Sequence, residues 1–130
     1  MSDMDRLFSY IDESREEVAR LQAELTSRVA LGPANGGTGE HDKAAFLEGE
    51  LRRLEPDALE TIRAPDPEAE GGYRPNLVAR WDGRTREPRV WVLSHMDVVP
   101  AGDPNLWDSD PFRLRVDGDR LFGRGVEDDQ

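Results

Sequence analysis

The sequence contains no cysteine, which excludes disulfide bonds, thiolate metal ligands and a cysteine nucleophile. It has only two histidines, His41 and His95, so metal or covalent chemistry must rest on these, on carboxylates or on hydroxyls. No apolar run approaches the about 20 residues that span a bilayer, and the first residues lack the basic and apolar regions of a secretory signal. These absences predict a cytoplasmic protein without a membrane partner.

Basic residues are scarce beside acidic ones, with 17 against 28 and a formal net charge of −11. Because a polyanion requires a basic stripe, we expect no nucleic-acid partner. Only one of the basic residues, Lys43, is a lysine. An acidic, lysine-poor surface is typical of a halophile, in which high salt screens self-repulsion, but the arginine codons of a G+C-rich genome explain it equally well.

Apolar residues are also few: 36% of the 130 residues are hydrophobic, and the mean hydropathy is −0.75. A chain of this length forms one domain at most, and this composition predicts a thin core. We therefore expect residues 1–130 to be part of a larger protein.

Hydrophobic periodicity predicts the order of the elements. Apolar residues at three- and four-residue steps predict one amphipathic helix over residues 4–30, capped by Ser2 or Asp3. The glycine-rich residues 32–40 predict a flexible loop. A second helical pattern covers residues 45–54 and stops at a proline.

Strand patterns follow the helices. Short strands are expected over residues 58–63 and 76–81, and residues 113–123 alternate around an Asp-Gly turn, as in an edge hairpin. Residues 89–94 are almost continuously apolar, which predicts a central strand covered on both faces. This order predicts an α/β or α+β fold with an open sheet.

The most informative residues follow this apolar segment, in the sequence Ser-His-Met-Asp-Val-Val-Pro of residues 94–100. His95 and Asp97 are two apart at the end of an expected strand, so their side chains point to the same side. Asp97 could orient His95 as a metal ligand. On the pair alone, however, a purely structural hydrogen bond at a strand end is the better supported interpretation.

A second concentration of functional groups is the sequence Gly-Arg-Gly-Val-Glu-Asp-Asp-Gln of residues 123–130. Like charges repel, so an isolated acidic cluster is most simply a solvated tail. With a cation nearby, the same carboxylates could ligate or bridge metal ions, and the glycines would allow the tight backbone that such a loop needs.

Three motifs in order resemble the co-catalytic zinc peptidase and deacylase family, which includes acetylornithine deacetylase, succinyl-diaminopimelate desuccinylase and carnosinase-type dipeptidases. They read SHMDVVP, WDSDPF and DGDRLFGRGVEDD, over residues 94–100, 107–112 and 117–129. The resemblance implies an α/β fold with a zinc-peptidase-like open mixed sheet flanked by helices. It also implies that residues 1–130 are the N-terminal part of the catalytic domain, without the dimerisation domain.

The resemblance further implies residue roles. His95 would be a metal ligand, Asp97 the catalytic carboxylate beside it, and Asp128 the ligand that bridges two ions. The ions would be zinc, with cobalt or manganese as alternatives, and the Asp128–Asp129 peptide bond would be cis. Two such ions share a water molecule that becomes the nucleophile.

The implied function is hydrolysis of an amide bond in a dipeptide or an N-acyl amino acid, by a protein that is a homodimer at full length. The general base and the remaining ligands would lie beyond Gln130, so the isolated chain is expected to be inactive. The alternatives are a catalytically inactive truncated product and an acidic, non-enzymatic interaction module.

Other notable residues receive structural roles. Trp107, Pro111 and Phe112 are expected to pack under the acidic loop rather than contact substrate. Arg124 is expected to brace that loop through an ion pair. His41 is interpreted as a surface or helix-capping residue.

Overall fold

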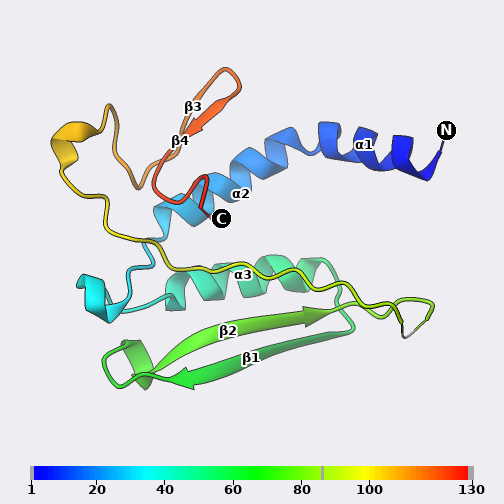
Figure 1. Cartoon of the computed structure of the whole chain (residues 1–130), viewed down its shortest axis with the longest axis horizontal. Helices are drawn as coiled ribbons and strands as arrows, with labels where there is room; N and C mark the ends of the chain where they lie inside the picture. The colour runs from blue at the N-terminus through cyan, green and yellow to red at the C-terminus, as the bar shows by residue number, and fades with distance from the viewer. Residues whose placement is uncertain (1, 86, 129–130) are drawn as a thin grey trace.

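The computed structural model describes residues 2–85 and 87–128, which form helices and small antiparallel sheets (Figure 1). The elements in chain order are α1 (Asp3–Glu13), α2 (Arg15–Ser27), α3 (His41–Arg53), β1 (Ala58–Pro65), β2 (Tyr73–Arg80), β3 (Arg115–Asp117) and β4 (Arg120–Phe122). This mixture of helices and strands confirms the α/β class. Within the described residues, β1 pairs with β2 and β3 pairs with β4, as two separate sheets.

The N-terminal helix is divided in two. Ser2 caps α1: its hydroxyl accepts the N–H of Asp5, and the Asp5 side chain accepts the N–H of Ser2. The prediction of one helix over residues 4–30 is wrong, because α1 ends at Glu13 and α2 begins at Arg15. The hydroxyl of Ser14 donates to the Tyr10 carbonyl at 2.7 Å, a local bond that bends helices.

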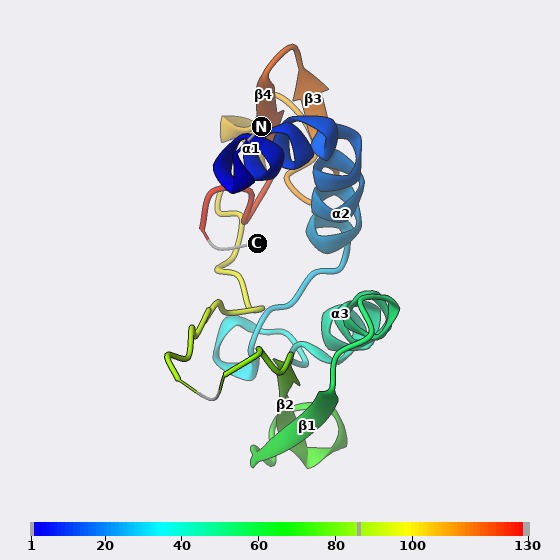
Figure 2. The same cartoon turned by 90° about the vertical axis from the view of Figure 1, so that its right-hand side faces the viewer.

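Helix α3 and the β1–β2 hairpin form the most regular part of the molecule. The two strands pair over their full length, from Ala58 opposite Arg80 to Pro65 opposite Tyr73. Helix α3 lies along β2, and both views show it beside this hairpin (Figures 1 and 2). These elements were predicted, but α3 starts at His41, four residues earlier than its apolar pattern.

The β3–β4 hairpin lies near α1 and α2, at the other end of the molecule from β1 and β2 (Figure 2). Arg15 ties this hairpin to α2, because its guanidinium pairs with Asp119 and donates to the Gly118 carbonyl at 3.2 Å. Gly118 takes a left-handed conformation at the turn, with φ of 59°. The predicted Asp-Gly hairpin is therefore confirmed.

The expected central strand over residues 89–94 is not formed. This segment runs as an extended connection without a strand partner in the described residues (Figure 1). Its apolar side chains are largely exposed: Val90 89%, Trp91 70%, Val92 88% and Leu93 84%. The prediction failed because burial on both faces needs a strand on each side and helices above and below, and among the described residues no strand pairs with this segment.

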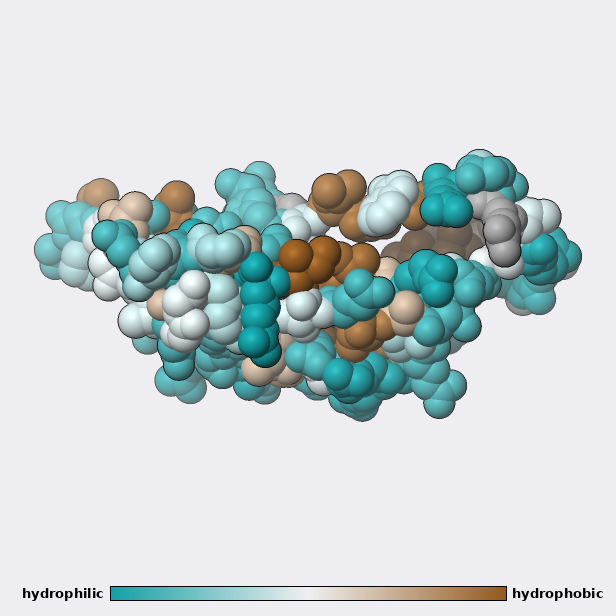
Figure 3. Space-filling model, turned by 90° about the horizontal axis from the view of Figure 1, so that it is seen from below, coloured by the Kyte–Doolittle hydropathy of each residue, from teal (hydrophilic) through white to brown (hydrophobic). Residues whose placement is uncertain are grey.

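The core is thin, as the composition predicted. The buried apolar side chains in the described residues are small or medium in size, and they are accompanied by buried polar side chains. Apolar side chains instead reach the surface in the space-filling view (Figure 3). In the part of the chain that the structure describes, no helix is both long and apolar enough to cross a membrane.

Candidate functional site

The segment that carries His95 and Asp97 is anchored by the residue that follows them. The N–H of Val98 donates to the Ala30 carbonyl at 2.9 Å, just beyond the end of α2. Val98 is 5% exposed and Ala30 1% exposed. This buried contact holds the segment against the helical layer and leaves His95 and Asp97 half exposed beside it.

The ring of His95 lies between two aspartates. Its Nδ1 is 2.8 Å from the backbone carbonyl oxygen of Asp97 and 3.3 Å from that residue's Oδ1, whereas its Nε2 is 3.3 Å from Oδ1 of Asp128. A proton on Nδ1 is donated to the backbone carbonyl of Asp97, and in the imidazolium Nε2 also donates to Asp128. In the neutral ring with its proton on Nδ1, the Nε2 lone pair is available to a cation. The structure thus brings together the three residues that the sequence singled out.

The two carboxylates also act on the charge of the ring. The hydrogen bond with Asp128, followed by that with the Asp97 carbonyl, raises the pKa of His95 above its ordinary value. The cause is stabilisation of the imidazolium by negative neighbours.

Asp128 reaches His95 because the loop of residues 123–128 packs tightly. A Cβ at Gly123 would lie 2.9 Å from Cγ2 of Thr26 on α2, so only glycine fits there. Gly125 adopts a φ of 87°, in the left-handed region that favours glycine. The backbone N–H of Arg124 donates to the Pro111 carbonyl at 2.6 Å.

The Ala101 carbonyl links two of the sequence motifs. It accepts a hydrogen bond from Nε1 of Trp107 at 2.9 Å and one from Nη2 of Arg124 at 3.4 Å. The Arg124 guanidinium also lies 5.2 Å from the centroid of the Trp107 ring. Arg124 therefore braces the loop as expected, but through a carbonyl and a ring, and the described residues show no ion pair for it.

A surface hollow of about 250 Å³ lies over these groups, lined by His95, Asp97, Val98, Val99 and residues 123–128. It is large enough to admit water, ions and part of a small substrate. A neighbouring hollow of about 300 Å³ is lined by residues 106–109 and by residues of the β3–β4 hairpin and the loop after it, among them Phe122. The candidate groups therefore face accessible space.

The donor set fits a metal ion in chemistry and spacing. Imidazole nitrogen and carboxylate oxygen are both zinc ligands, and two atoms that share one tetrahedral zinc lie roughly 3.4 Å apart. The 3.3 Å between Nε2 of His95 and Oδ1 of Asp128 matches this spacing and is long for a charge-assisted hydrogen bond. Within residues 2–85 and 87–128, however, no group of three or more potential ligands is assembled, and Asp129 lies outside the described residues.

The other histidine, His41, packs against a neighbouring aromatic ring. The ring of His41 meets the Tyr73 ring at 4.6 Å and 71°, and both ring nitrogens are buried without a hydrogen-bond partner in the described structure. The residue that caps α3 is Glu40. The interpretation of His41 as a surface or capping residue is therefore wrong, because Tyr73 on β2 covers the ring.

Sequence reasoning missed the charged residues behind Asp97. Nη2 of Arg74, on β2, lies 3.8 Å from Oδ2 of Asp97, and the same guanidinium pairs with Glu40. Lys43 on α3 is 2% exposed, and its pKa falls to about 8 because burial disfavours the ammonium. No local motif marks these residues; the scarcity of lysine was the only signal that pointed to Lys43.

Comparison with known proteins places these residues in context. An uncharacterized metallohydrolase of Methanococcus maripaludis is 32% identical over 117 residues, which cover 87% of this chain and 28% of the relative. A succinyl-diaminopimelate desuccinylase of Gluconobacter oxydans is 35% identical over 108 residues, covering 83% of this chain and 25% of the relative. A Beta-Ala-Xaa dipeptidase of Lactobacillus delbrueckii is 38% identical over 64 residues, covering 45% and 13%.

The chain thus spans little more than a quarter of the methanococcal relative. The model of peptidase family M20/M25/M40 matches residues 91–130, the part that contains all three motifs. The site residues His95, Asp97 and Asp128 all fall within this match. Residues 91–130 therefore identify this part of the chain with peptidase family M20/M25/M40.

Proposed function

We propose that this chain contributes His95, Asp97 and Asp128 to the metal centre of a metal-dependent amide hydrolase. The observation that carries the proposal is the position of His95, with Nδ1 held by Asp97 and Nε2 3.3 Å from Asp128. The family and the relatives named as metallohydrolase, desuccinylase and dipeptidase support the same chemistry. In this proposal, residues 1–130 are the N-terminal part of a catalytic domain.

Each residue has a defined task in the proposed site. His95 and Asp128 hold the metal, with Asp128 bridging a pair of ions, and Asp97 keeps the proton of His95 on Nδ1. We propose zinc as the metal, with cobalt or manganese as substitutes. Bound zinc would supply a water molecule of lowered pKa and polarise the amide carbonyl.

The substrates we propose are small: a dipeptide or an N-acyl amino acid. The names of the relatives support both classes, because one is a dipeptidase and another removes a succinyl group from an amino acid. The net charge of −11 supports a protein that does not act on nucleic acid. We also propose a homodimer at full length, as the resemblance implies, and a cytoplasmic location.

A second candidate is a catalytically inactive chain. It is favoured by the absence of a third potential ligand near His95 and Asp128 among the described residues. Two ligands without a general base do not make a competent hydrolytic site. In this case the chain would bind metal weakly, or act as an acidic interaction module.

Activity of the natural full-length protein separates the two candidates. We expect hydrolysis of N-acyl amino acids or dipeptides, loss of that activity with a chelator, and recovery with zinc. Asp128→Asn is expected to remove activity, whereas Asp119→Asn, a matched change at the exposed β3–β4 turn, is expected to retain it. Full activity in Asp128→Asn would contradict the proposal.

A further inference from the structure

The guanidinium of Arg74 is held firmly from one side. The carboxylate of Glu40, the residue before α3, accepts a hydrogen bond from Nε of Arg74 at 2.7 Å and pairs with Nη2 of the same guanidinium. Glu40 is 4% exposed, so this is a buried carboxylate that needs its partner. The favourable pairing with Glu40 raises the pKa of Arg74, so the guanidinium stays charged.

The nitrogen Nη2, which pairs with Glu40, also faces the candidate site, whereas Nη1 lies 3.9 Å from Oδ2 of Asp66. Nη2 of Arg74 lies 3.8 Å from Oδ2 of Asp97. Nδ1 of His95 lies 2.8 Å from the backbone carbonyl oxygen of Asp97 and 3.3 Å from its Oδ1, so the carboxylate supports the ring beside the carbonyl. The two carboxylate oxygens are thus divided between a cation and the ring. Glu40, Arg74, Asp97 and His95 form a continuous series from the packed half of the molecule to the site.

A second cation strengthens this arrangement. Lys43 is buried on α3, and its Nζ has no hydrogen-bond partner among the described residues. The negative charges of Asp97 and Glu40 both favour its ammonium, against the cost of burial. Asp97 therefore interacts with positive charge on both α3 and β2.

We propose that Arg74, fixed by Glu40, is a positioning residue that holds the carboxylate of Asp97 and thereby the ring orientation and tautomer of His95. The inference rests on the proposed function, since it assigns His95 as a metal ligand. A carboxylate behind a ligating histidine fixes the ring nitrogen that carries the proton, and loss of such support typically lowers metal affinity about 10- to 100-fold. Arg74 acts one contact further away and touches neither metal nor substrate.

The test uses the natural full-length protein with ¹⁵N-labelled histidine. NMR of the metal-free protein, at a pH where the ring is neutral, reports which nitrogen of His95 carries the proton. We expect a larger share of the Nδ1–H form in the wild type than in Arg74→Met, in which the attraction of Asp128 for a proton on Nε2 is less well balanced. Zinc affinity is expected to fall about 10-fold in Arg74→Met, and Arg74→Lys, which keeps the charge, is expected to recover part of both effects.

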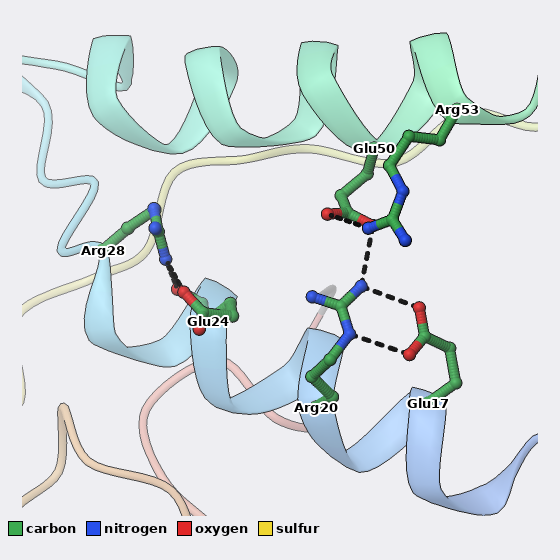
Figure 4. A network of polar contacts seen from close by, with 6 residues as sticks. All are labelled: Glu17, Arg20, Glu24, Arg28, Glu50 and Arg53. Carbon is green, nitrogen blue, oxygen red and sulfur yellow. Dashed lines mark hydrogen bonds and ion pairs between the residues drawn. The ribbon is translucent and has the colours of Figure 1, made fainter.

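A matched control is available in α2. Arg20 makes a similar two-point contact with Glu17, at 2.7 Å for each bond, and also pairs with Glu50 on α3 (Figure 4). Arg20→Met removes an equivalent arginine that has no contact with Asp97. We expect it to leave the His95 tautomer and zinc affinity unchanged, so equal effects of Arg20→Met and Arg74→Met would reduce Arg74 to a general structural role.

Two further results keep the inference testable. If Arg74→Met does not fold, Glu40→Gln can replace it, because glutamine keeps one acceptor for Arg74 but loses the negative charge. Glu40→Gln should shift the His95 tautomer in the same direction by a smaller amount. A wild-type spectrum in Glu40→Gln would overturn the inference. If His95→Ala does not lower zinc affinity, the proposed function fails. The tautomer measurement on metal-free protein still judges the role of Arg74, so the two failures are distinguishable.

Discussion

Two regions of the molecule differ in how well their side chains are covered. One is the unit formed by α3, β1 and β2, and the other is the segment of residues 89–128. In the first region, eight residues of β1 pair with eight residues of β2, and Lys43 and Ala44 of α3 are buried. The second carries the three family motifs, but its strands are three residues long and its apolar segment is largely exposed. The candidate site lies in the less covered region.

The comparison teaches that the site obtains its order from other parts of the chain. Val98 is held by the carbonyl of Ala30, Gly123 fits against Thr26, and Asp97 faces Arg74 on β2. Each contact joins a motif residue to a residue of the helices or the long hairpin. Changes in the two regions should therefore have different consequences, which the following predictions use.

The largest difference is expected between the two histidines. His95→Ala in the full-length protein should lower metal affinity and activity by more than about 100-fold, because it removes a proposed ligand itself. His41→Ala should cost about 1–2 kcal/mol of stability through lost packing on Tyr73, with activity per folded molecule retained. Metal titration and thermal unfolding of both variants test this pair, and full activity in His95→Ala would refute the assignment.

The next prediction concerns the exposed apolar segment. Trp91→Ala should change the stability of the 130-residue chain by no more than about 0.5 kcal/mol, since the side chain is 70% exposed. Denaturant unfolding of the wild type and of Trp91→Ala provides the measurement. A cost of about 3–5 kcal/mol, as for a buried tryptophan, would contradict the exposed position of this side chain.

Lys43 gives the packed unit a distinctive pH dependence. Its pKa of about 8 in the folded protein lies below its ordinary value of 10.5. Between these values the unfolded chain binds more protons, so stability should rise with pH by up to about 3 kcal/mol. Unfolding from pH 7 to 10.5 should show this rise in the wild type and not in Lys43→Met. A flat wild-type profile would show that the buried ammonium carries no such penalty.

A contrast of opposite sign is expected at two glycines, one in each region. Gly123→Ala should cost about 1–3 kcal/mol, since its Cβ would press on Thr26, and it should weaken metal binding by displacing Asp128. Gly49→Ala, within α3 where nothing lies within 4 Å of the added Cβ, should stabilise the protein by about 0.5–1 kcal/mol. Calorimetry of both variants measures the contrast; a stabilising Gly123→Ala would show that the loop is not packed as described.

The sequence predicted those helices, strands and turns that depend on interactions between residues close together in the chain. The amphipathic pattern of α3, the alternation of β2 and the Asp-Gly turn at Gly118 each specify their element within a few residues. The spacing of His95 and Asp97 likewise predicted neighbouring side chains. The placement of Asp128 beside them came from the family resemblance, because 33 residues separate it from His95.

The remaining features depend on contacts that are distant in sequence. Burial of residues 89–94 was predicted from their apolar character, but such burial requires partners that the described residues lack. Glu40 and Arg74 are 34 residues apart, and neither belongs to a motif. Their relation to Asp97 appears only once α3 and β2 are packed together.

The most direct test of the central claim is the metal content of the natural full-length protein, purified without chelator, in the wild type and in Asp128→Asn and Asp119→Asn. We expect two zinc ions per wild-type chain, the same in Asp119→Asn, and a clear loss in Asp128→Asn. Unchanged metal content in Asp128→Asn would contradict the claim that His95 and Asp128 together hold the metal.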